Sequence, residues 1–110
     1  NCVVYTGTHD NDTTVGFIKN MPEKDLKFAK KYLGHKNEKK LCFEMIRAAL
    51  SSCADTAVIP MQDYLELDSS ARINIPSTLG CNWKWRMDQD ALDPKLAKKI
   101  YKMAKLYGRL

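Results

Sequence analysis

The stretch VVYTGTHDNDTTVG, residues 3–16, decides the fold that we predict. Residues 3–5 are β-branched and aromatic, which is typical of a buried strand, and Gly7 lets the backbone pass close to another group. A cluster of polar side chains follows at residues 9–12. In α/β proteins ligands bind at the carboxyl ends of parallel strands, because the loops there vary while the strands hold them rigid. The stretch therefore predicts a strand that ends in a binding or catalytic site.

Composition and length bound the class of protein. The 110 residues suffice for one modest domain, and 45% hydrophobic with 28% charged residues is ordinary for a soluble globular protein, which excludes disordered and collagen-like classes. No apolar run is long enough to span a bilayer, and the first residues lack the pattern of a signal peptide, so we expect no membrane segment. The chain starts almost inside a strand, and we expect it to be a fragment.

The charge balance raises the question of a nucleic-acid partner. The net charge of +5 comes from 18 basic and 13 acidic residues, and much of the excess lies at residues 24–40 and 95–105. Both stretches have helical patterns, with the lysines on polar faces and without an RNA-binding signature. We favour solvated helix faces and expect no nucleic-acid partner; a basic nucleic-acid binder would show steeply salt-dependent affinity.

The cysteines argue against a metal site. Cys2, Cys42, Cys53 and Cys81 form no Cys-x-x-Cys pair and lack zinc-ligand spacing with either histidine. We expect four free thiols, no metal and a cytoplasmic location, since the cytosol is reducing. Cys42 and Cys53 are three helical turns apart, so we expect both in the core on one apolar face.

The remaining pattern predicts helices around a second strand. We expect helices at residues 22–33, 38–53 and from 93 to about 107, a strand at 57–59, a short helical turn at 64–67 and a long structured loop at 68–90. Both strands should be parallel and buried. Two strands alone cannot form a stable sheet covered on both faces, so we expect the end of a larger parallel α/β domain.

Asp10 and His9 are the first candidate site residues. A carboxylate at a strand end can stabilise positive charge or orient a hydroxyl-rich ligand, and an imidazole can donate a hydrogen bond to a substrate hydroxyl. The alternative is a plain Asx or Ser/Thr turn at residues 11–14 that caps the next segment. A calcium loop is disfavoured, because its glycine and terminal glutamate are missing.

The loop at residues 68–90 holds the second candidate group. Its amides and flat aromatic rings suit sugars, whose hydroxyls accept and donate hydrogen bonds while their C–H faces pack on rings. The alternative is that Trp83 and Trp85 anchor the loop to the domain body, which we favour for each Trp taken singly. Asn74 is the better ligand candidate.

Three motifs together carry a specific resemblance. YTGTHDNDTT at residues 5–14, IPMQD at 59–63 and RINIPSTLGCNWKWR at 72–86 resemble the C-terminal part of the 4-alpha-glucanotransferases, also called amylomaltases or disproportionating enzymes. The resemblance implies an α/β fold in which residues 1–110 supply the last two βα units of a (β/α)8 TIM barrel, from strand 7 to the C-terminal helix. It also implies retaining transfer of α-1,4-glucan segments between maltooligosaccharides, without a cofactor.

The same resemblance implies roles for four residues. Asp10 matches a carboxylate that assists catalysis by stabilising the transition state, and His9 matches its substrate-binding neighbour. Asn74 falls in the loop that closes one side of the donor pocket, and Asn82 matches a further substrate contact. Cys81 departs from the pattern, since we expect Gly there.

The larger departure is that no segment matches the strands that bear the nucleophile or the acid/base. We therefore expect the chain alone to be inactive and the activity to belong to a full-length enzyme. The alternative is a stand-alone carbohydrate-binding or interaction module without catalysis. In either case we expect the strand edges to be covered, by the remainder of the barrel or by self-association.

Overall fold

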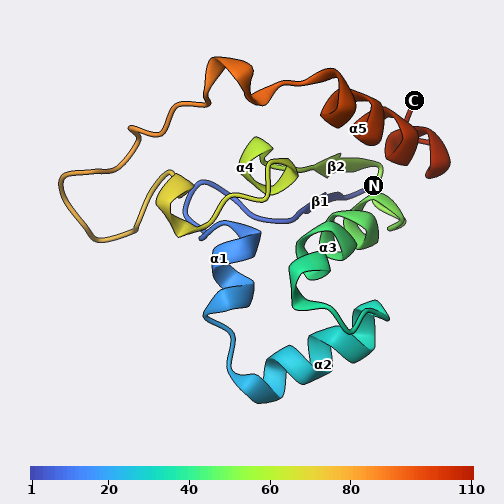
Figure 1. The fold of residues 1–110 in the computed structure, drawn as a ribbon, viewed down its shortest axis with the longest axis horizontal. Coiled ribbons are helices and arrows are strands. Elements are labelled where there is room, and N and C mark those ends of the chain that lie inside the picture. The colour runs from blue at the N-terminus through green and yellow to red at the C-terminus, as the bar shows by residue number, and fades with distance from the viewer.

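The computed structural model describes residues 1–110 and pairs two short strands side by side, with helices around them (Figure 1). The strands β1 (Val3–Tyr5) and β2 (Thr56–Val58) are parallel, with Val4 opposite Ala57. The helices are α1 (Thr14–Lys19), α2 (Glu23–Leu33), α3 (Leu41–Leu50), α4 (Met61–Tyr64) and α5 (Pro94–Leu106), with 3-10 turns at Glu38–Lys40, Ser69–Ala71 and Gln89–Ala91. The predicted α/β class and the parallel pairing are confirmed.

The hydrophobic core forms around α3. Its Leu41 and Ile46 are completely buried, and the helix contacts α1, α2, α4 and α5. The other buried members of the core are Ile18, Cys42, Phe43, Leu50 and Met103. Apolar residues three and four apart lie on the same face of a helix, which is why this helix buries one continuous stripe.

The end of α3 corrects one prediction. The helix stops at Leu50, and Cys53, expected in the core, is exposed. The hydroxyls of Ser51 and Ser52 donate to the carbonyls of Ala48 (3.1 Å) and Ala49 (2.8 Å). Such local side-chain bonds satisfy carbonyls that a longer helix would use, so the backbone leaves the helix before Cys53. All four thiols are free, as predicted.

Two short helices also differ from the prediction. Residues 14–19 form α1, where we expected only a polar turn; the Thr13 hydroxyl accepts the Gly16 N–H at 3.1 Å and caps the helix. The capping role that was the alternative for this segment is therefore present. The turn expected at 64–67 begins earlier, as α4, because Pro60 has a fixed φ that suits the residue before a first helical turn.

The strands are less buried than predicted. Val3, Tyr5 and Val58 are 49%, 51% and 42% exposed, whereas Ala57 packs against the core. The expectation of fully buried strands is wrong for this chain, because helices cover one face and no third strand pairs with either edge. None of the helices has the length and apolarity that a membrane crossing requires.

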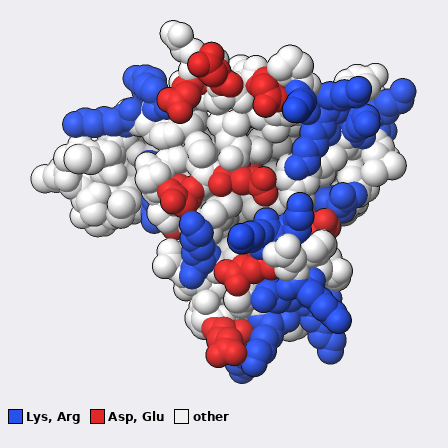
Figure 2. Space-filling model, in the orientation of Figure 1, with Lys and Arg blue, Asp and Glu red and all other residues white.

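Basic residues are spread over the outer helices. Figure 2 shows lysines and arginines over α2 and α5, with acidic side chains among them. On α2, Lys27 Nζ lies 3.1 Å from the Glu23 carboxylate. This neutralising pair lies on the face that we predicted to be solvated, and exposed pairs of this kind add little stability.

Arg109 attaches the C-terminal segment to the end of α3. The Arg109 guanidinium donates to the carbonyls of Leu50 (2.9 Å), Ser52 (3.0 Å), Ala54 (2.6 Å) and Asp55 (3.3 Å). These carbonyls lie at or just after the helix C-terminus, where a cation is favoured by the helix dipole.

We expect Arg109→Ala to lower the free energy of unfolding by about 2 kcal/mol, because it leaves carbonyls of the α3 terminus without a charged donor. Urea denaturation followed by circular dichroism measures this. Arg109→Lys keeps the charge near the helix end, so its free energy of unfolding should fall by less. Equal decreases for the two variants would contradict the role of the charged donor.

Candidate functional site

A buried carboxylate holds the segment that follows β1. Asp63, just after β2 and 2% exposed, accepts hydrogen bonds from the Thr6 hydroxyl (2.6 Å), the Thr14 N–H (2.8 Å) and the Thr14 hydroxyl (2.8 Å). Because Asp63 lies on α4, the segment between the two threonines is thereby fixed at both ends against α4. Our sequence prediction included Asp63 in a motif but gave it no role; its position directly after the second strand was the available signal.

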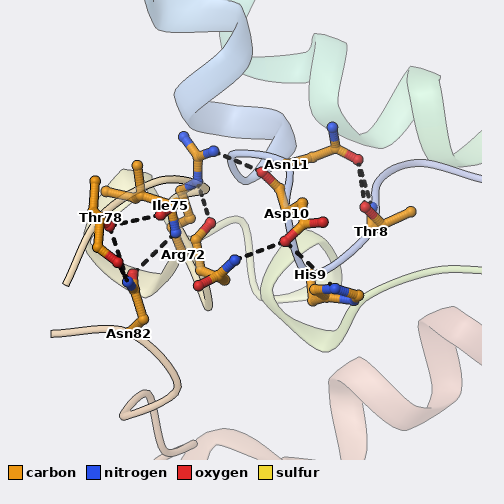
Figure 3. A network of polar contacts seen from close by, with 9 residues as sticks. Thr8, His9, Asp10, Asn11, Arg72, Ile75, Thr78 and Asn82 are labelled. Atoms are coloured by element: carbon orange, nitrogen blue, oxygen red, sulfur yellow. Dashed lines mark hydrogen bonds and ion pairs between the residues drawn. The ribbon is translucent and has the colours of Figure 1, made fainter. Parts of the chain in front are cut away.

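Three of the predicted site residues lie together on that segment and the loop facing it. The Asn74 amide donates to Asp10 Oδ1 at 2.7 Å, and His9 Nε2 lies 3.4 Å from the same oxygen (Figure 3). The Asn74 N–H also donates to the His9 carbonyl at 3.1 Å. The side chains of His9 and Asp10 are about half exposed, at 53% and 49%. The cluster therefore presents a carboxylate and an imidazole that a ligand can reach.

Arg72 joins the same cluster from the loop that carries Asn74, and sequence reasoning missed it. Its Nη2 donates to the Asp10 carbonyl at 2.6 Å and its Nε to the Asn74 carbonyl at 2.9 Å. No spacing rule points to this residue, since both acceptors are main-chain atoms and one lies 62 residues away in the sequence.

Asn82 is not brought to the cluster. Its Oδ1 accepts the Ile75 N–H at 3.0 Å, and its Nδ2 donates to the Thr78 hydroxyl at 2.9 Å and carbonyl at 3.2 Å. Figure 3 shows its side chain against Thr78, away from Asp10. The amide therefore closes the loop at residues 75–82. Cys81, in this loop, has no positive φ, so the Cys in place of Gly adds no left-handed strain.

Trp83 connects this loop to His9. Its ring centroid lies 5.0 Å from that of His9 at an interplanar angle of 38°. The backbone N–H of Trp83 donates to the Ile73 carbonyl at 2.7 Å. The residue has a φ of 62°, which is unfavourable for a bulky side chain and recurs at functional sites. Trp83 is still 58% exposed, so its ring both anchors the loop and presents an apolar surface.

A hollow of about 430 Å³ opens beside the cluster, between the ends of the two strands. His9, Asp63 and Arg72 are among the residues that line it. The Cys42 thiol donates to the Asp63 carbonyl at 3.5 Å, and burial raises the pKa of this thiol to about 12. Cys42 is therefore a protonated packing residue and not a nucleophile. No three His, Cys, Asp or Glu side chains are grouped so that they could hold a metal ion.

Comparison with known proteins places this chain in a family. The family model described as 4-alpha-glucanotransferase matches residues 1–92. The chain belongs to the 4-alpha-glucanotransferase family. The resemblance found in the three sequence motifs is confirmed, and with it the expectation that the homologous proteins are glucan-transferring enzymes.

Relatives match along almost the whole chain but extend well beyond it. The chloroplastic/amyloplastic 4-alpha-glucanotransferase of Oryza sativa subsp. japonica is 47% identical over 98% of this chain and 19% of its own length. The 4-alpha-glucanotransferase of Clostridium butyricum is 44% identical over 99% of this chain and 23% of its own length. The chain thus spans about a fifth of the curated relatives that it matches.

A solved structure shows the same fold in this part. Amylomaltase from Streptococcus agalactiae, in a complex with acarbose, superposes with a TM-score of 0.92 at 27% identity, over 97% of this chain and 22% of that chain. The α/β arrangement of this family member therefore matches that of a known amylomaltase.

Proposed function

We propose that the full-length protein carrying this chain is a 4-alpha-glucanotransferase that transfers α-1,4-glucan segments between maltooligosaccharides with retention of configuration. In this proposal, residues 1–110 form the last two βα units of a catalytic (β/α)8 barrel, from strand 7 to the C-terminal helix. The observation that carries the proposal is the contact of Asp10 with Asn74 and His9 at the carboxyl end of β1, in a chain of this family.

Asp10 is proposed to stabilise the transition state. Its Oδ1 is held by Asn74, whereas its Oδ2 has no hydrogen-bond partner within the chain and is free to accept a sugar hydroxyl. A fixed negative charge at this place favours the positive charge that develops on an oxocarbenium-like sugar. His9 and Asn74 are proposed to bind the substrate hydroxyls. Asn82 is proposed to contribute indirectly, because its amide holds the shape of the loop at residues 75–82 that forms part of the binding surface.

The nucleophile and the acid/base are proposed to come from parts of the full-length protein outside this chain. The exposed face and edges of the two strands, at Val3, Tyr5 and Val58, are proposed to be covered by the remainder of the barrel. The four free thiols support a cytoplasmic location, and the proposed mechanism uses no cofactor.

The test is disproportionation of maltotriose. We expect the purified full-length protein to form glucose and longer maltooligosaccharides, detected by anion-exchange chromatography, and the 110-residue chain alone to form none. Transfer products with retained anomeric configuration support the retaining mechanism. Binding of maltotriose by the full-length protein without any products would contradict the proposal and favour a carbohydrate-binding module.

A further inference from the structure

Arg72 connects the two segments that carry the candidate site. It directly follows the 3-10 turn Ser69–Ala71, and its partly buried side chain runs toward the loop after β1 (Figure 3). The guanidinium uses two different nitrogens, Nη2 toward the Asp10 carbonyl at 2.6 Å and Nε toward the Asn74 carbonyl at 2.9 Å. One rigid, planar group thereby fixes the main chain of both residues.

These are the same two residues whose side chains meet. The Asn74 amide reaches Asp10 Oδ1 at 2.7 Å only if their backbones keep their present separation. Several other hydrogen bonds of this turn are internal, such as those from the Thr8 N–H and hydroxyl to Asn11 Oδ1 at 2.7 and 2.9 Å. Such bonds preserve the shape of the turn but do not attach it to the facing loop.

Attachment between the turn and that loop therefore depends on few contacts. Besides the side-chain bond of Asn74, they are the Asn74 N–H to the His9 carbonyl at 3.1 Å, the Ser69 hydroxyl to the Asp12 carboxylate at 2.8 Å and the Arg72 Nη2 to the Asp10 carbonyl at 2.6 Å. The second bond of Arg72, to the Asn74 carbonyl, stays within the loop and holds Asn74 in place. Arg72 supplies the only charged donor among them, and hydrogen bonds from a charged donor are stronger than neutral ones.

We propose that Arg72 is a positioning residue for glucan transfer, which holds Asp10 and Asn74 at the separation that the transition state requires. The proposal rests on the proposed function. Arg72 bonds main-chain carbonyls and leaves the carboxylate of Asp10 free for the sugar. Its effect on the reaction is therefore exerted through Asp10.

A positioning role predicts a particular kinetic signature. Misplacing a reacting group by about 1 Å costs up to about 100-fold in rate. An interaction that matters mainly in the transition state lowers kcat while KM changes little. We therefore expect Arg72→Ala in the full-length protein to lower kcat for maltotriose by about 100-fold, with KM within about threefold of wild type.

Two further variants distinguish the two-donor geometry of the Arg72 guanidinium from its positive charge. Arg72→Lys keeps the positive charge, but one ammonium cannot reproduce two in-plane donors, so it should stay at least about tenfold below wild type in kcat. Lys84→Ala is the matched control, because Lys84 is an exposed cation of the same loop without a hydrogen-bond or ion-pair partner, and it should leave kcat unchanged. All rates are compared at a temperature at which circular dichroism shows every variant folded.

The outcomes distinguish this proposal from the proposed function. If wild type transfers α-1,4-glucan segments and Arg72→Ala does so with kcat within about twofold of it, the positioning role is overturned while the function stands. The same holds if Lys84→Ala loses as much activity as Arg72→Ala. If wild type shows no transfer, the proposed function fails. A crystal structure of the full-length Arg72→Ala protein then tests the positioning role independently of activity. Separation of Asn74 Nδ2 from Asp10 Oδ1 supports this role, and persistence of the 2.7 Å contact overturns it.

Discussion

Replacing Asp10 by Asn should lower the rate of maltotriose disproportionation by the full-length protein by about 10²–10³-fold, because a fixed charge opposite the developing positive charge is lost. The substitution keeps the shape of the side chain, and an Asn oxygen can still accept the bond that the Asn74 amide now makes at 2.7 Å. The loss should therefore be electrostatic, with the fold intact. Initial rates of glucose release measure it.

The matched control is Asp90→Asn, which removes a carboxylate from an exposed position without hydrogen-bond or ion-pair partners. This variant should turn over at the wild-type rate, and both variants should unfold at the wild-type temperature. Near-normal turnover by Asp10→Asn would remove Asp10 from the proposed mechanism, and an equal loss in Asp90→Asn would show a general effect of charge.

The largest effect on stability is expected from Asp63. Asp63→Leu should lower the free energy of unfolding by about 3 kcal/mol or more, because it leaves several buried donors without an acceptor. The donors are the Thr6 hydroxyl and both the N–H and the hydroxyl of Thr14. Leu is larger than Asp and leaves no cavity, so the loss comes from the unpaired donors and from fitting the larger side chain.

Urea denaturation followed by tryptophan fluorescence measures this change. Asp88→Leu is the control, since it makes the same substitution at an exposed position whose side chain has no hydrogen-bond partner, and its midpoint should stay close to wild type. An Asp63→Leu midpoint equal to that of the control would contradict the role of the buried carboxylate as the attachment of the site segment.

Helices with long amphipathic patterns were predictable from the sequence. The expected helix at residues 22–33 is α2, and Pro22 and Gly34 stand at its two ends, Gly34 with a φ of 70°. The helix opened by Asp93 is α5, and the Asp93 carboxylate accepts the Leu96 N–H at 2.7 Å. Such ends are decided by residues next to each other in the chain, so their signals are local.

Short elements were predicted less well, because their limits depend on distant contacts. α1 forms where Gly16 packs so closely that an added Cβ would clash with the Ser69 hydroxyl and lie 2.6 Å from the Asp12 carboxylate. Ser69 itself donates to that carboxylate at 2.8 Å. A sequence pattern does not contain this neighbour, 53 residues away from Gly16, and therefore predicts only a turn here.

The stretch at residues 3–16 determined, by its composition alone, a strand followed by a polar turn that carries His9 and Asp10. The order of the three motifs also determined the family, since their residue types and spacing are read directly from the chain. Tertiary structure alone decided that Arg72 and Asp63 hold this turn and that Asn82 closes its own loop. The physical reason is that the bonds of Asp63 and Arg72 join groups 49 and 62 residues apart, and that Arg72 and Asn82 bond main-chain atoms common to every residue. Such pairs are specified only when the chain packs.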